Sequence, residues 1–295
     1  MAIFVPESTV RIGGRIGWLN GLMLGVSIAI LLFAIGEAST WGWASWRTTA
    51  CILLAVVTFI GWVIHSGRTS SPPVDLSLIR GRPVLTNLVA QFSGQAVIAL
   101  QFVLLAFIVQ TSSTLGLGYG LGGDATYTAQ ITTPSGIASV AMGFVVAYTA
   151  ERRGARLPAW IGFSLMAAGS IGMAFWHSSF WTTLVAYVLF SFGGGLVNAA
   201  ISNLVIASAP VRVQAVTAAT VNVVGSLGSA VAVQVGFAIL SLHILSVVSG
   251  APIYAGIGFT IVYIIAALIA IAGFVSTILM PHGRRPQSKE SEAGE

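Results

Sequence analysis

Charged residues are scarce in this chain. Of its 295 residues only 7% are charged, whereas 56% are hydrophobic. A soluble domain carries about 25% charged residues. The scarcity excludes a water-soluble globular domain, because so few charges could not cover a surface that faces water. Most of the surface must therefore face lipid.

Long uncharged runs divide the chain into candidate membrane spans. Each gap between successive charges fits one or two helices of about 20 residues, the length that crosses a hydrocarbon core about 30 Å thick. Helices are predicted because lipid offers no partner to free backbone groups, and because the runs do not alternate as barrel strands do. The predicted fold class is all-α, a polytopic membrane protein of about eight transmembrane helices. The spans are 17–36, 48–65, 84–109, 126–149, 158–176, 181–208, 214–242 and 254–279.

Basic residues lie almost entirely on one side of this arrangement. If the N-terminus is cytoplasmic, Arg47 is the only one of the 13 basic residues in an outer segment. Cytoplasmic loops are rich in Arg and Lys, so both termini are predicted to be cytoplasmic. The predominance of arginine over lysine indicates a GC-rich bacterial genome, hence a bacterial plasma membrane. The net charge of +5 follows from this bias and indicates no nucleic-acid partner.

Residues that carry catalysis or bind metals are also few. Cys51 is the only cysteine and lies within a predicted span, which excludes a disulfide framework and a cysteine metal site. His65, His177, His243 and His282 have no second ligand at metal spacing. The chain has no H-E-x-x-H motif and no serine with a partnered base. We therefore expect no enzyme activity, no metal and no cofactor.

Glycines cluster between the third and fourth spans. The stretch GYGLGG, Gly118–Gly123, fits the G-x-G-x-x-G pattern of dinucleotide-binding loops. Such a site needs a preceding strand and a helix N-terminus that holds the pyrophosphate, but here a membrane span precedes the glycines and no cation is near. The stretch is predicted to be an outer turn, because glycine readily adopts positive φ.

The basic loop between the fourth and fifth spans, AYTAERRGAR from 147 to 156, resembles the loop signature G-x-L-a-D-R-x-G-x-R of the major facilitator superfamily. Glu151 stands at the position of the acid, and Arg152, Gly154 and Arg156 match directly. The first glycine and the hydrophobic position differ. An acid and several arginines in a short turn can pair with each other and with helix ends. The resemblance implies a conformational latch at these four residues; a purely topogenic loop is the alternative.

Other segments are similar to the fourteen-helix drug:proton antiporters of that superfamily, in their actinobacterial form. These segments are the linker 73–84, the outer loop 110–120, Trp41–Trp43, Gly193–Gly195 and 222–234. Gly225 departs from the pattern, because it stands where the family has an arginine. The resemblance implies that this chain matches the two central extra helices and the C-terminal six-helix lobe, without the N-terminal lobe.

The resemblance and the spans together predict five segments. They are a cytoplasmic segment 1–16, two extra transmembrane helices 17–65, a cytoplasmic linker 66–83, a six-helix transporter lobe 84–279 and a disordered cytoplasmic tail 280–295.

Polar residues inside the spans are the candidate functional residues. No carboxylate lies within a predicted span; Glu37 and Asp124 fall at span ends, and Asp124 is predicted to cap a helix N-terminus. No proton-coupling residue is identified, since the resemblance places the main proton-carrying acid in the N-terminal lobe. The uncharged candidates for a substrate pathway are Gln91, Gln95, Gln101, Asn198, Asn203, Asn222 and Gln234. Interhelical hydrogen bonding is the alternative role for them.

The resemblance implies a function in transport. Transporters of this class hold substrate between two lobes that move about a central site. The chain is expected to be part of a proton-coupled efflux antiporter for small molecules. Its expected partners are the lipid bilayer, a small-molecule substrate and a separate N-terminal lobe. Two alternatives are a non-transporting membrane protein that packs against other helices and a non-functional truncated product.

Overall fold

The computed structural model describes residues 18–68, 82–113, 116–208, 214–248 and 251–280. Within these ranges, eight helices are long and apolar enough to cross a membrane. They are α1 (Trp18–Trp41), α2 (Trp46–Arg68), α4 (Arg82–Gln110), α5 (Ala125–Arg153), α6 (Arg156–Phe175), α7 (Phe180–Ser208), α8 (Gln214–Ser241) and α9 (Gly256–Leu279). The predicted fold class and the number of spans are confirmed, but the first span reaches Ala38, so that Glu37, predicted to lie outside the spans, falls inside it.

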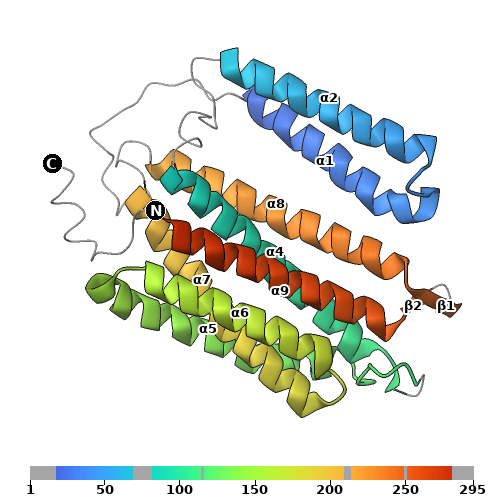
Figure 1. The fold of residues 1–295 in the computed structure, drawn as a ribbon. Coiled ribbons are helices and arrows are strands. Elements are labelled where there is room, and N and C mark those ends of the chain that lie inside the picture. Colours follow the sequence, from blue (N-terminus) through green and yellow to red (C-terminus); the bar gives the residue numbers. More distant parts are fainter. Residues whose placement is uncertain (1–17, 69–81, 114–115, 209–213, 249–250, 281–295) are drawn as a thin grey trace, which may run out of the picture.

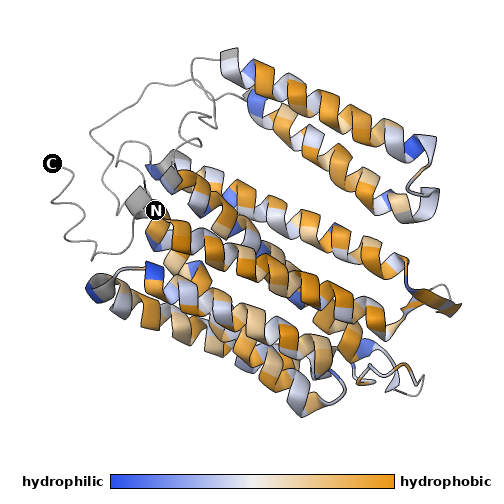
Figure 2. Cartoon of the chain, viewed as in Figure 1, coloured by the Kyte–Doolittle hydropathy of each residue, from blue (hydrophilic) through white to orange (hydrophobic). Residues whose placement is uncertain are grey.

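Helices α4 to α9 form one bundle, and α1 and α2 form an antiparallel pair beside α8 (Figure 1). The start of α1 and the end of α9 lie at the same end of the molecule, as an even number of spans requires. Apolar residues cover the helices along their length (Figure 2). The predicted segment 1–16, most of the linker 66–83 and nearly all of the tail 280–295 lie outside the described residues.

Glycines allow α7 to pack closely against two neighbours. A Cβ atom added to Gly193 would collide with the carbonyl oxygen of Gly162 in α6. On the other side of α7, a Cβ atom on Gly195 would collide with the carbonyl oxygen of Ser139 in α5. Small residues let helix backbones approach closely in membranes. The glycine run 193–195 therefore fixes α7 between α5 and α6.

The glycine stretch 118–123 completes the C-terminal end of α4. Gly118, Gly120 and Gly122 have positive φ angles of 74°, 102° and 63°, which favour glycine. The backbone amide of Gly123 donates to the carbonyl oxygen of Val109, 2.9 Å away. It thereby pairs one of the carbonyls that a helix end leaves without a partner. The prediction of a turn is confirmed, and its place on the outer side of the membrane stays a prediction.

Asp124 caps the N-terminus of α5. Its carboxylate oxygen Oδ1 accepts a hydrogen bond from the backbone amide of Tyr127 at 2.9 Å. The predicted N-cap is therefore confirmed. Further along α5, Pro134 lies inside the helix, where it removes one backbone hydrogen bond to the carbonyl four residues earlier.

A β-hairpin connects α8 to α9 and was not predicted. Strands β1 (Ile244–Val248) and β2 (Ala251–Tyr254) pair antiparallel. The hydroxyl of Tyr119 donates to the carbonyl oxygen of Tyr254 at 2.6 Å, which ties the glycine loop to the hairpin. Burial raises the pKa of Tyr119, so this hydroxyl stays protonated as a donor at neutral pH. The hairpin escaped prediction because its short apolar strands follow an apolar helix directly.

Candidate functional site

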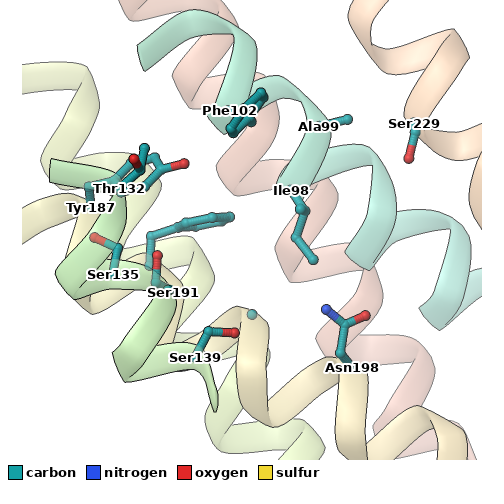
Figure 3. A pocket seen from close by; sticks show the side chains of 13 residues that line it. Ile98, Ala99, Phe102, Thr132, Ser135, Ser139, Tyr187, Ser191, Asn198 and Ser229 are labelled. Carbon is teal, nitrogen blue, oxygen red and sulfur yellow. The ribbon is translucent and has the colours of Figure 1, made fainter. Parts of the chain in front are cut away.

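A hollow of about 430 Å³ opens on one face of the bundle, between α4, α5, α7 and α8 (Figure 3). Aliphatic and aromatic side chains line one part of it, and hydroxyl groups line another. The lining residues are Ile98, Ala99, Phe102, Thr132, Ser135, Gly136, Ser139, Tyr187, Phe190, Ser191, Gly194, Asn198 and Ser229.

The helices at the two edges of the hollow are less buried than those behind it. Of the membrane span of α5, 22% is buried, and of that of α8, 33%. The value is 61% for both α6 and α7. Side chains of α5 such as Ile137 and Phe144 are largely exposed. The face that carries the hollow is therefore the open side of the bundle.

The glycine run of α7 also shapes the floor of the hollow. Gly193 and Gly195 face α6 and α5, which leaves Gly194 between them to face the hollow. The nearest atoms to a Cβ added at Gly194 are those of Ile98, 3.9 Å away. Gly193 and Gly195 thus let α7 pack closely against α6 and α5, and Gly194 leaves space for the hollow.

Two of the predicted substrate-pathway residues meet at this site. The amide Nε2 of Gln95 in α4 donates to Oδ1 of Asn198 in α7 at 2.9 Å, and Asn198 lines the hollow. Gln91 lies one turn before Gln95 and is buried. A Cβ atom on Gly225 of α8 would lie 2.9 Å from Nε2 of Gln91. An arginine at that position would not fit between α4 and α8 in this packing.

The structure places three other candidates away from the hollow. Gln101 is buried and donates from Nε2 to the hydroxyl of Ser170 in α6 at 2.8 Å. Asn203 donates to a carbonyl of its own helix, that of Ala199. Gln234 lies against Gly36 of α1, and so faces the α1–α2 pair.

The last candidate, Asn222, is exposed on α8. It lies seven residues before Ser229, which lines the hollow. Residues seven apart share a helix face, so Asn222 continues the face of the hollow toward the inner end of α8.

The loop that resembles the superfamily signature connects α5 and α6 to the end of α9. The guanidinium of Arg156, which is buried, donates to the carbonyl oxygens of Thr277 and Ile278. Cations favour helix C-termini because the carbonyls there carry partial negative charge. Gly154 has φ 79° at the end of α5, a conformation that favours glycine.

The other two predicted latch residues lie at the end of α5. Arg152 is exposed, and its guanidinium lies 4.4 Å from the ring centroid of Tyr148. Glu151 belongs to the described helix, but its side chain lies outside what the structure describes. All the described contacts of the loop are within the lobe, and a role as a conformational latch stays a prediction.

Sequence reasoning missed the hydroxyl groups of the hollow. Thr132, Ser135 and Ser139 follow one another on α5 at spacings of three and four, which places them on one helix face. Ser191 and Tyr187 contribute from α7. The spacing on α5 was a usable signal, but serine and threonine are common in membrane helices, where their hydroxyls also bond their own backbone.

Comparison with known proteins is consistent with this architecture. The model of the Major Facilitator Superfamily matches residues 8–233. The Tetracenomycin C resistance and export protein of Streptomyces glaucescens is 24% identical over 216 residues, which cover 71% of this chain and 39% of that protein. The multidrug transporter mfsC of Aspergillus fumigatus is 23% identical over 173 residues, which cover 59% of this chain and 32% of that protein.

Solved structures share the fold. A POT family transporter in complex with 5-aminolevulinic acid superposes with a TM-score of 0.56 at 17% identity, over 72% of this chain and 43% of that one. A peptide transporter POT in complex with sulfate gives 0.56 at 18% identity, over 72% and 42%. The chain spans about two fifths of the length of most of these relatives. The family match over residues 8–233, carried by a six-helix bundle with an open polar face, shows that this chain belongs to the Major Facilitator Superfamily.

Proposed function

We propose that this chain supplies one substrate-binding lobe of an efflux transporter for small molecules and acts together with a second six-helix lobe. The observation that carries the proposal is the hollow between α4, α5, α7 and α8, which opens on the least buried side of the bundle. A second lobe on this side would enclose the hollow at the lobe interface, where such transporters bind substrate.

The direction of transport rests on the relatives. One is named for resistance and export, the other as a multidrug transporter. Efflux across a bacterial plasma membrane, with both termini in the cytoplasm, agrees with the distribution of arginine. Proton coupling is part of the proposal, with the proton-carrying acid on the second lobe. The described acids of the six-helix lobe support this, because Asp124 and Glu151 lie at the ends of α5, whereas Glu37 lies in the first span, outside that lobe.

The four residues Glu151, Arg152, Gly154 and Arg156 are proposed to stabilise one conformation of this lobe at its inner end. Support comes from Arg156, which joins the start of α6 to the last carbonyls of α9. Gln91, Gln95, Asn198 and Asn222 are proposed to lie along the substrate pathway. Gln101, Asn203 and Gln234 are proposed to hold helices together, because their described contacts lie away from the hollow.

A first experiment asks whether the second lobe is on the same polypeptide. An antibody against residues 282–295 would be used on native membranes. A band at roughly twice the calculated 30.6 kDa would place both lobes, which are of similar size in this fold, on one polypeptide. A band near 30.6 kDa would place the second lobe on a separate chain.

The decisive experiment measures efflux of a fluorescent dye from cells that contain the chain together with its second lobe. We expect the cells to expel the dye only when both lobes are present, and a protonophore to stop the expulsion. If a folded pair of lobes, verified in the membrane, moves neither dye nor protons, the efflux proposal is wrong. The chain would then be a non-transporting membrane protein or a truncated product.

A further inference from the structure

The wall of the hollow carries no charge. None of its lining residues is an acid, a base or a histidine. A charged group on a ligand in such a place would lose part of its hydration without gaining a counter-charge, which disfavours its binding.

Free hydrogen-bonding groups line one side of the hollow. Among the described residues, the hydroxyls of Ser139, Tyr187 and Ser191 make no hydrogen bond, so they remain available to a ligand. Asn198 accepts from Gln95 through Oδ1, which leaves the two donors of its amide nitrogen. Hydroxyls both donate and accept. This side therefore suits hydroxyl and carbonyl groups.

Apolar side chains line the opposite side. Ile98 and Phe102 project from α4 across from the serines of α5 and α7 (Figure 3). The ring of Phe102 is 64% exposed, so its face is open to contact. A flat aromatic ring packs favourably on another beyond the effect of the area buried. A volume of about 430 Å³ suits a ligand of drug size.

We propose that this wall binds the uncharged aromatic part of a substrate that carries hydroxyl or carbonyl groups on one edge, and that it disfavours cationic and anionic aromatics. The ring would lie against Phe102, and its polar edge would meet Ser139 and Ser191. The proposal rests on the proposed function, because it names the substrate class of the same site.

The test measures binding to the full chain in lipid nanodiscs by equilibrium dialysis, with empty nanodiscs subtracted. Three flat tricyclic probes of similar size differ in charge: 2-hydroxyanthraquinone, used below its phenol pKa so that its hydroxyl is neutral and free to bond, cationic 9-aminoacridine and anionic anthraquinone-2-sulfonate. We expect the neutral probe to bind about tenfold more tightly than either ion, which corresponds to about 1.4 kcal/mol. Equal or tighter binding of an ion would overturn the proposal.

Variants locate the binding. The double variant Ser139→Ala with Ser191→Ala removes the free hydroxyls, and we expect it to weaken binding of the neutral probe about tenfold, equivalent to two hydrogen bonds. Ser164→Ala is the matched control, because Ser164 is exposed on α6 and bonds the carbonyl of Trp160 away from the hollow. Equal affinity of the double variant and the control would also overturn the proposal.

A variant that is expected to gain affinity for the cationic probe adds a further test. Asn198→Asp places a carboxylate on an exposed site in the wall and is expected to raise the affinity for 9-aminoacridine while that for the neutral probe falls. If Asn198→Asp lowers the affinity for all three probes, the assignment of this wall as the binding site is wrong.

Failure of this proposal differs from failure of the proposed function. If the neutral probe binds with the expected variant pattern but the pair of lobes exports nothing, the substrate class stands and efflux does not. If the pair exports the cation and the serine variants change nothing, efflux stands and the substrate class is wrong.

Discussion

The two sides of the six-helix bundle are built from different residues. On the closed side α6 packs on α7 through glycines, and a Cβ atom on Gly169 would lie 2.6 Å from Cβ of Phe190. On the open side α5 and α8 flank a hollow lined with serine, threonine and aromatic side chains. Both sides rely on the same helix, α7. The difference shows that glycine contacts fix α7 closely against α6 and, at Gly195, against α5, while small polar residues beside them leave space for the hollow.

Glycine substitution in α7 gives the largest expected effect and tests this comparison directly. Gly195→Val would force a branched side chain into the backbone of α5 at Ser139. We expect a loss of about 3 kcal/mol in stability, by overpacking, and a lower melting temperature in detergent. Gly194→Ala is the adjacent control, because its Cβ would meet only Ile98 at 3.9 Å. Equal melting temperatures for the two variants would contradict the packing described.

Arginine substitution at the inner end gives the next largest effect. Arg156→Gln removes the donors to the carbonyls of Thr277 and Ile278, and we expect a loss of about 2 kcal/mol, since hydrogen bonds to charged groups are strong. Thermal unfolding in detergent measures it. Arg152→Gln changes an exposed arginine of the same loop and is expected to leave the melting temperature nearly unchanged. A larger fall in melting temperature for Arg152→Gln than for Arg156→Gln would contradict the roles assigned to the two arginines.

One side-chain hydrogen bond, from Tyr119 to Tyr254, joins the glycine loop to the hairpin. Tyr119→Phe keeps the ring packed on Phe259, at 4.7 Å between centroids, but removes the bond to the carbonyl of Tyr254. We expect a loss of about 1 kcal/mol and faster amide exchange in the hairpin β1–β2. Unchanged exchange there would show that the glycine loop does not hold the hairpin.

The smallest effect concerns the amide pair at the hollow. A double-mutant cycle on Gln95→Leu and Asn198→Leu is expected to give a coupling of about 0.6 kcal/mol, typical of polar pairs between membrane helices. The same cycle on Gln101 and Ser170, which are fully buried, is expected to give a larger coupling energy. A weaker coupling for the buried pair would show that exposure to the hollow does not govern these bonds.

Much of the fold could be predicted because lipid imposes simple rules. Span number and helix type follow from apolar length and the absence of charge, and the cap at Asp124 follows from its place before an apolar run. The β-hairpin could not be found, because four or five apolar residues beside a long apolar helix have no distinct period.

The site was harder to predict than the fold. The seven amides were chosen for polarity alone, and polarity does not say which face of a helix a residue occupies. Gln95 and Asn198 meet at the hollow, whereas Gln101 bonds inside the bundle. That difference depends on how α4 is rotated against α7, which is set by close contacts such as that of Gly94 with Val197. Such contacts join residues far apart in the sequence.

Pro134 is expected to make α5 easier to bend than the other helices that line the hollow. The proline lies in α5 between two lining residues, Thr132 and Ser135, and interrupts the hydrogen-bond ladder there. A helix bends most readily where a backbone hydrogen bond is missing, so we expect α5 to bend most easily beside the hollow. The contact of Gly195 with Ser139 holds α5 after the proline, so we expect the part of α5 before Pro134, which carries Thr132, to adjust to ligands of different widths.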